Sequence, residues 1–146
     1  MARNYTVRTR ILRPVAEVFD AITSREKLCH YFTDKASGDL VPGEVIRWHW
    51  DHYGELPIRV DEVVANERIV LTLNSREWDK TSSDAYDVSV VFDFEPLDDG
   101  NTMLSISEAG WKTDADGLKA SHENCSGWTH MAVCLKSWIE HGIDLR

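Results

Sequence analysis

The sequence lacks any long hydrophobic run. No apolar stretch approaches the ~20 residues that a helix needs to cross a bilayer, so we expect no membrane insertion. The first residues include arginines but no apolar segment typical of a signal peptide. We therefore expect a cytoplasmic protein.

Cysteine is scarce. Cys29, Cys125 and Cys134 form an odd-numbered, widely spaced set. This pattern predicts reduced thiols rather than a disulfide framework, in keeping with a cytoplasmic location.

Basic residues are also in deficit. The chain has 16 Lys and Arg against 25 Asp and Glu, a formal net charge of -9. Because phosphate binding needs clustered basic side chains, we expect no nucleic-acid partner. The arginines near the N-terminus are spread along the first predicted strand and its end, and we expect them to form a solvent-exposed face of that strand. They are Arg3, Arg8, Arg10 and Arg13.

Signatures of catalysis and of metal binding are missing as well. No serine or cysteine lies in a nucleophile-elbow sequence, and no Gly-rich phosphate loop follows a strand. The histidines and cysteines do not provide the three or four converging ligands that zinc requires. We expect no cofactor and no metal, and we assign no catalytic residue. If the chain performs chemistry, acid/base work by Glu108, Glu62 or His122 is the form we expect.

Periodicity predicts one α+β domain over residues 1–146. Alternating apolar residues predict a first strand, which is followed by two short helices with Pro14 at the start of the first. Five more strands and a long C-terminal helix over residues 116–141 follow, and Gly142 is placed to end that helix. The predicted strands cover residues 5–12, 44–50, 58–64, 69–73, 88–94 and 102–106. Strands joined by hairpins form an antiparallel sheet, and the long helix is expected to cover one face of it.

Six tryptophans are unusual for a chain of 146 residues, and large rings are normally used for a core, a ligand wall or an interface. The first half of the long helix presents Leu118, Ser121 and Cys125 toward the sheet, flanked by His122 and Asn124, and most of these side chains are small or mildly polar. This pairing predicts a gap beneath that half, and hence an apolar pocket for a small molecule. The alternative is a core that the tryptophans themselves fill. Apart from Glu62, Glu108 and His122, the residues expected to line the pocket are Phe32, Trp48, Trp50, Leu71, Trp78, Phe92, Ile106, Trp111, Ser121, Cys125 and Trp128.

Two of these candidates are carboxylates. Glu62 is in phase with Val60 and Glu108 with Ile106, so both are expected to point inward, where a carboxylate needs a partner or a raised pKa. The alternatives are a solvated strand end for Glu108 and an exposed sheet edge for Glu62. Trp78 and Trp111 lie in predicted loops and either close the mouth of the pocket or plug the surface.

Several motifs together resemble the START-like, or SRPBCC, superfamily. Residues 13–22 resemble its opening strand-to-helix motif, and residues 28–32 match the short helix that follows. Residues 41–44 resemble its Pro-Gly-Gly turn, with Glu44 in place of the second glycine. Residues 127–128 and 135–142 resemble its ending. The short bacterial branch described as activators of the heat-shock-protein ATPase is the most similar.

The resemblance spans nearly the whole chain. It implies a helix-grip fold, in which six or seven strands form a curved antiparallel sheet around the long helix and leave a cavity between them. It does not imply one activity. Because the bulky rings lie on the predicted inner faces, we expect a carrier or sensor of a small hydrophobic molecule, aromatic or polycyclic. The alternatives are an enzyme similar to polyketide cyclases and aromatases, or a co-chaperone-like activator of a heat-shock ATPase, with a chaperone or a second copy as partner.

Overall fold

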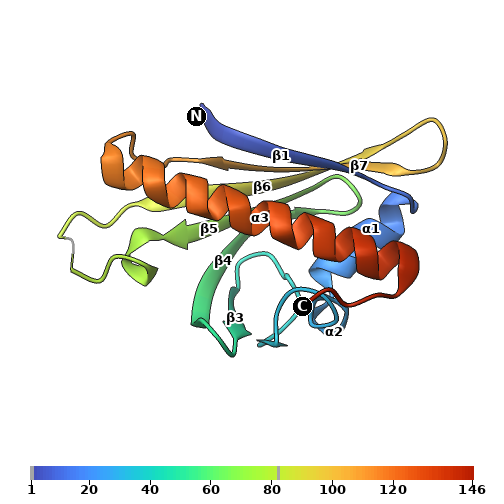
Figure 1. The fold of residues 1–146 in the computed structure, drawn as a ribbon, viewed down its shortest axis with the longest axis horizontal. Coiled ribbons are helices and arrows are strands. Elements are labelled where there is room, and N and C mark those ends of the chain that lie inside the picture. Colours follow the sequence, from blue (N-terminus) through green and yellow to red (C-terminus); the bar gives the residue numbers. More distant parts are fainter. Residues whose placement is uncertain (1, 82) are drawn as a thin grey trace.

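A computed structural model describes residues 2–81 and 83–146. A curved antiparallel sheet is crossed on one face by a single long helix (Figure 1). The strands are β1 (Arg3–Ile11), β2 (Lys35–Ala36), β3 (Val45–Trp50), β4 (Gly54–Val64), β5 (Arg68–Asn74), β6 (Asp87–Pro96) and β7 (Thr102–Ala109). The helices are α1 (Val15–Thr23), α2 (Arg25–Leu28), the 3₁₀ helix η1 (Ser75–Glu77) and α3 (Ala115–His141).

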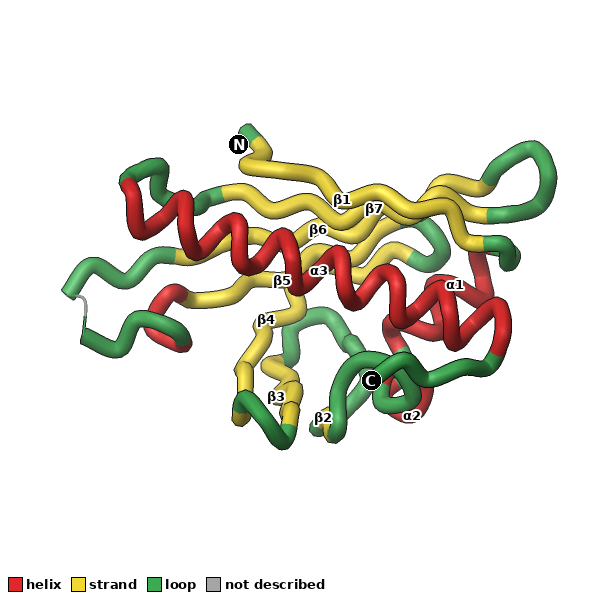
Figure 2. The backbone as a smooth tube through the Cα atoms, in the orientation of Figure 1, coloured by secondary structure: helices red, strands yellow, loops and turns green. Residues whose placement is uncertain are grey.

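The seven strands lie in the order β1-β7-β6-β5-β4-β3-β2, with every neighbouring pair antiparallel. The strands from β2 to β7 form a meander, and β1 joins its far edge beside β7. Figure 2 shows the β3–β4 end of the sheet turning under α3 toward α2, where the C-terminus lies. This is the helix-grip fold that the sequence predicts. The two-residue β2 and η1 were not predicted, because both are too short to show a period.

Local chemistry sets the helix ends. The Asp114 side chain caps α3 by accepting a hydrogen bond from the Gly117 backbone N–H at 2.8 Å, which satisfies an otherwise unpaired amide. Gly142 ends α3 in the left-handed region, with φ of 68°, where glycine costs least. Pro14 was predicted to be the first helical residue, but its extended backbone makes it the N-cap of α1.

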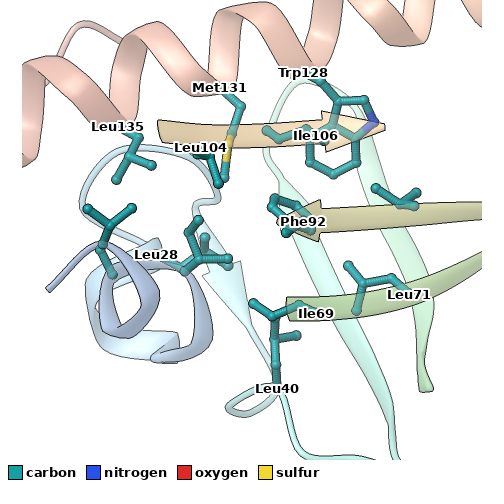
Figure 3. Close-up of a cluster of buried hydrophobic side chains, with 14 of the residues drawn as sticks. Leu28, Leu40, Ile69, Leu71, Phe92, Leu104, Ile106, Trp128, Met131 and Leu135 are labelled. Carbon is teal, nitrogen blue, oxygen red and sulfur yellow. The ribbon is translucent and has the colours of Figure 1, made fainter. Parts of the chain in front are cut away.

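The core lies between the concave face of the sheet and the second half of α3. Figure 3 shows Trp128, Met131 and Leu135 pointing from α3 toward the inward side chains of the strands, with Leu28 of α2 closing one end. These side chains are buried, and burial of each contributes about 1.5–3 kcal/mol. Leu118, predicted to face the sheet, is instead 45% exposed. The tightly packed half of α3 is therefore the second half, as its bulky residues indicate.

Candidate functional site

A cavity of about 520 Å³ opens between the middle of α3, the β3–β4 hairpin and the turn after α2. Its size lies within the range of small-molecule sites. Its lining residues are Tyr31, Phe32, Asp34, Trp48, Trp50, His52, Tyr53, Leu56, Leu73, Asn124, Gly127, Trp128, His130 and Arg146. Aromatic side chains supply the walls, and polar side chains gather at the rim.

Four rings form one continuous aromatic wall. The Phe32 ring stands edge-on to Trp48 and Trp50, with centroids 5.4 and 5.2 Å apart. Trp128 of α3 meets Trp48 at 6.4 Å and Phe92 at 5.4 Å, both nearly perpendicular. Such edge-to-face pairs hold aromatic rings in fixed orientations. The wall is therefore preorganised, with β3, α3 and the turn after α2 each contributing to it.

The indole nitrogens of the wall differ in their partners. Trp50 Nε1 donates to the Phe32 carbonyl oxygen at 2.8 Å, which ties β3 to the turn after α2. Trp48 Nε1 is buried and has no hydrogen-bond partner in residues 2–81 and 83–146. A buried donor without an acceptor costs about 1–3 kcal/mol. Trp48 therefore lines the cavity with part of its ring while its indole N–H stays buried and unpaired.

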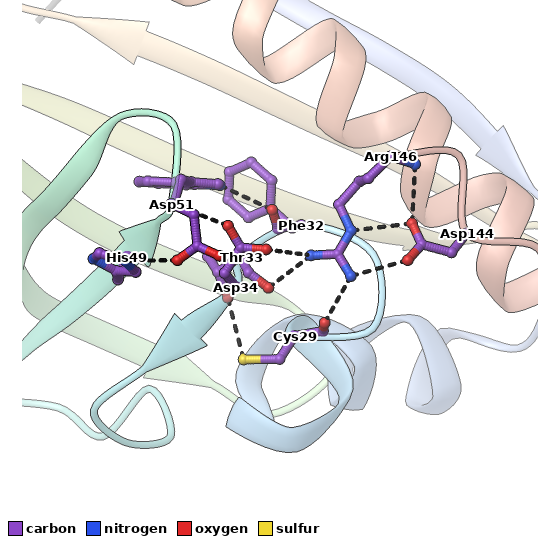
Figure 4. A network of polar contacts seen from close by, with 9 residues as sticks. Cys29, Phe32, Thr33, Asp34, His49, Asp51, Asp144 and Arg146 are labelled. Atoms are coloured by element: carbon purple, nitrogen blue, oxygen red, sulfur yellow. Dashed lines mark hydrogen bonds and ion pairs between the residues drawn. The ribbon is translucent and has the colours of Figure 1, made fainter.

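Arg146 fastens the C-terminal segment to the rim (Figure 4). Its Nη1 donates to the Thr33 carbonyl oxygen at 2.9 Å and lies 3.6 Å from an Asp34 carboxylate oxygen. Its Nη2 donates to the Cys29 carbonyl oxygen at 3.0 Å, and Nε and Nη2 both reach the Asp144 carboxylate at 3.0 Å. The guanidinium thus joins the chain after α3 to the α2–β2 turn and closes one side of the cavity.

Behind the aromatic wall lies Glu108, a fully buried carboxylate at the end of β7. Its Oε1 accepts hydrogen bonds from the Tyr5 hydroxyl and from Trp111 Nε1, the latter at 2.8 Å. Its Oε2 accepts from Asn124 Nδ2 at 2.7 Å and from Trp128 Nε1 at 2.9 Å. Four uncharged donors from β1, α3 and the segment after β7 thus surround the carboxylate, and bonds to an ionised acceptor are the stronger kind.

Burial raises the pKa of the Glu108 carboxyl above its ordinary value, and the four donated hydrogen bonds limit the rise. Burial and the neighbouring Glu108 charge raise the pKa of Tyr5 far above its usual range, so its hydroxyl keeps its proton. The Trp and Asn donors match the ionised form of Glu108, because their N–H groups cannot accept a hydrogen bond from a protonated carboxyl.

A second, smaller cavity of about 280 Å³ lies at the start of α3. Trp78 is in its lining and packs against the buried Trp111 at 5.0 Å. Neither tryptophan lines the larger cavity. The two loop tryptophans therefore fill space beside the first half of α3, as in the plug alternative for these positions.

The structure brings only some of the predicted pocket residues together. Phe32, Trp48, Trp50 and Trp128 line the larger cavity. Leu71, Phe92 and Ile106 are buried in the core below it. Glu108 points inward, as its phase on β7 predicts, but Trp128 and Asn124 stand between it and the cavity.

Two predicted residues do not face the interior at all. A β-bulge between Val60 and Glu62 shifts the phase of β4, so Glu62 is exposed and lies 3.8 Å from Arg68. The prediction that Glu62 points inward is wrong for this reason, because an extra residue reverses every side chain beyond it. His122 is also exposed on α3.

The larger cavity opens at the middle of α3 and is not lined by Ser121 or Cys125, two of the helix residues predicted to line it. Ser121 is buried, and its hydroxyl donates to the Leu118 carbonyl oxygen at 2.9 Å. Cys125 is half-buried, and neither residue lines the larger cavity. The Glu108 cluster occupies the adjoining space, and the cavity opens farther along α3, beside Asn124, Gly127 and Trp128.

Sequence reasoning missed the polar half of the site. Asn124 and Tyr5 were not recognised as partners of Glu108, and Arg146 was not considered. One signal was present: Asn124 lies four residues before Trp128, and residues at this spacing share a helix face. Arg146 gave no signal. The backbone carbonyls that it binds, of Thr33 and Cys29, lie 113 and 117 positions before it in the sequence, and its carboxylate partner Asp144 lies two positions before it.

In the part of the chain that is described, no three His, Cys, Asp or Glu side chains converge as metal ligands. Within the same residues, no helix has the length and hydrophobicity needed to cross a bilayer.

Solved structures share this fold over nearly the whole chain. Protein SSP2350 from Staphylococcus saprophyticus is 23% identical with a TM-score of 0.78, covering 97% of this chain and 94% of that one. Protein MLL2253 from Mesorhizobium loti is 20% identical with a TM-score of 0.79, covering 95% and 98%. The Aha1 dimer from Colwellia psychrerythraea is 19% identical with a TM-score of 0.78, covering 97% and 98%.

No curated protein matches the sequence. The model of one protein family does match, over residues 13–140, which include every helix of the fold and most of the sheet. This range also contains the aromatic wall and the Glu108 carboxylate. The chain belongs to the family of activator of Hsp90 ATPase homolog 1-like proteins, within the SRPBCC superfamily.

Proposed function

We propose that this protein binds a small aromatic, hydrophobic molecule in the 520 Å³ cavity and acts as its carrier or sensor. The observation that carries the proposal is the preformed wall of Phe32, Trp48, Trp50 and Trp128 beside a cavity of ligand size. Planar ligands suit such a wall, because they stack on rings without reshaping the pocket.

The energetics support a binding role. Burying about 200 Å² of apolar ligand surface contributes roughly 5 kcal/mol before the costs of association.

Gly127 provides the test. It lines the cavity, and a Cβ at this position would meet no atom within 4 Å. We expect Gly127→Leu to fold normally and to fill the cavity, while Ser126→Leu adds the same side chain at the exposed neighbouring position on α3.

The measurement is quenching of tryptophan fluorescence by a panel of flavonoids, fatty acids and aromatic polyketides. We expect saturable quenching by aromatic members of the panel in the wild type and in Ser126→Leu, and its loss in Gly127→Leu. If no member of the panel quenches the wild type saturably, or if Gly127→Leu binds as the wild type does, the proposal is wrong.

The geometry of Glu108 argues for binding over turnover. An acid or base must reach the reacting atoms directly or through one water. Glu108 is instead fully buried, and its four donors include Trp128 and Asn124 of the cavity wall. An enzyme acting through Glu108 would show turnover of a bound ligand that Glu108→Gln abolishes while binding persists.

Family membership favours a second function, activation of an Hsp90-type ATPase by direct contact. The test is stimulation of ATP hydrolysis by a purified Hsp90-type chaperone. Stimulation that Gly127→Leu leaves intact would assign the activity to the outer surface rather than to the cavity.

A further inference from the structure

The side-chain amide of Asn124 has a fixed orientation. Its Nδ2 lies 2.7 Å from Glu108 Oε2. An ionised carboxylate only accepts hydrogen bonds, so the group that Asn124 turns toward it must be the NH₂ and not the carbonyl oxygen. The contact with Glu108 therefore places the NH₂ on the side of the carboxylate cluster.

This orientation decides what Asn124 offers to the cavity. The two ends of an amide point in different directions from its carbon, so Oδ1 is turned away from Glu108 when Nδ2 is turned toward it. Asn124 also lines the cavity and is half-buried. Among the residues that the structure describes, no group donates a hydrogen bond to Asn124 Oδ1.

The cation at the rim does not select for an acidic ligand. The Arg146 guanidinium is occupied by the Asp144 carboxylate, by two backbone carbonyls and by Asp34. Four of its five N–H donors therefore make hydrogen bonds, and the Asp34 carboxylate forms an ion pair with Nη1 at 3.6 Å. Asn124, in contrast, lines the cavity next to the aromatic wall, and its Oδ1 accepts no hydrogen bond from the residues that the structure describes.

The structure assigns Asn124 as the specificity-determining residue of the cavity: held by Glu108, it presents a hydrogen-bond acceptor, and the ligand is an aromatic molecule with a hydroxyl or N–H donor. This inference rests on the proposed binding function and narrows its ligand class. Glu108 acts here as a positioning residue, because it touches Asn124 and not the ligand.

The test compares two probes that differ in one donor. 2-Naphthol carries a hydroxyl, and 2-methoxynaphthalene has the same ring system with that donor blocked. Both are titrated into isotopically labelled protein by NMR. We expect the wild type to bind 2-naphthol about tenfold more tightly, the ratio that one well-made hydrogen bond gives.

Three variants locate the origin of the preference. Asn124→Leu removes the acceptor, and the ratio of the two affinities should fall to about one. In Glu108→Gln, the new NH₂ can donate to Asn124 Oδ1, so the amide can turn and present its own NH₂; the preference should then fall or invert. Glu123→Gln changes an exposed carboxylate on α3 and should leave the ratio at the wild-type value.

The outcomes separate the two proposals. If neither probe binds the wild type, the binding function fails and this inference fails with it. If both probes bind the wild type equally, or if Asn124→Leu retains the tenfold preference, this inference alone is overturned. Should Glu108→Gln not fold, Asn124→Leu still decides the matter.

Discussion

Trp128 forms part of the cavity wall with its ring and donates to Glu108 Oε2 with its indole nitrogen, at 2.9 Å. One side chain thus connects the binding surface to the buried carboxylate. Because the hydrogen bond fixes the ring, the shape of the cavity depends on a group that is not part of its lining. Glu108 therefore both stabilises the fold and holds the Trp128 ring in its place in the cavity wall.

Removing Glu108 is expected to cost much stability. Glu108→Ala leaves two indole N–H groups, an amide and a hydroxyl without their acceptor in a buried place. We expect the free energy of unfolding to fall by about 3–5 kcal/mol, as for other buried networks that lose one member. Urea denaturation measures the change.

Glu62→Ala is the matched control, since Glu62 is exposed, and its effect should stay within about 0.5 kcal/mol. A similar small loss for both variants would contradict the described role of Glu108.

The raised pKa of Glu108 predicts an unusual dependence on pH. The folded protein holds this proton at higher pH than the unfolded chain does, so folding takes up a proton between the unfolded value of about 4.3 and the higher folded value. The contribution of Glu108 to the free energy of unfolding therefore becomes more favourable as the pH falls through this window.

The measurement is urea denaturation of the wild type and of Glu108→Gln, which does not titrate at this position, at several pH values. The difference in unfolding free energy should shift in favour of the wild type as the pH falls toward 4.3. Asp144, whose pKa the hydrogen bonds with Arg146 lower to about 2, loses its contribution only at lower pH. A shift in the opposite direction would show that the folded pKa of Glu108 is lowered.

The start of α3 requires glycine at one position. A Cβ on Gly117 would lie 2.1 Å from the Lys112 carbonyl oxygen, well inside contact distance. Gly117→Ala should therefore displace the helix start and cost about 2 kcal/mol.

Gly127→Ala is the comparison, because a Cβ there meets nothing within 4 Å. In the middle of a helix this change should stabilise the protein by about 0.5–1 kcal/mol. Thermal and urea unfolding measure both variants, and equal effects at the two glycines would refute the packing described at Lys112.

The Arg146 contacts should contribute measurably to stability. Arg146→Ala removes hydrogen bonds to the Cys29 and Thr33 carbonyl oxygens and the pairing with Asp144. Because the guanidinium is partly buried, with 29% of the side chain exposed, we expect a loss of about 1–2 kcal/mol, read from urea denaturation.

Arg47→Ala provides the reference, since its pair with Glu55 spans 3.8 Å between exposed side chains and should contribute less than about 0.5 kcal/mol. A loss no larger for Arg146→Ala would mean that the C-terminal segment is not fastened as described.

Periodicity predicted the fold well, because β5, β6, β7 and α3 bury regular faces. It failed where the period breaks: the bulge at Glu62 and the two-residue β2 follow from pairing, which a single strand does not reveal. The aromatic wall was predicted in part from alternation on β3. The partners of Glu108 were not, because Tyr5, Trp111, Asn124 and Trp128 meet only in the folded chain.

The indole N–H signals of the six tryptophans report directly on whether the aromatic cavity binds a ligand. In an NMR titration with 2-naphthol, we expect saturable shifts of Trp48, Trp50 and Trp128 in the wild type and none in Gly127→Leu, with Trp78 unmoved. Absence of shifts at these three tryptophans, or shifts confined to Trp78 at the smaller cavity, would contradict binding in the aromatic cavity.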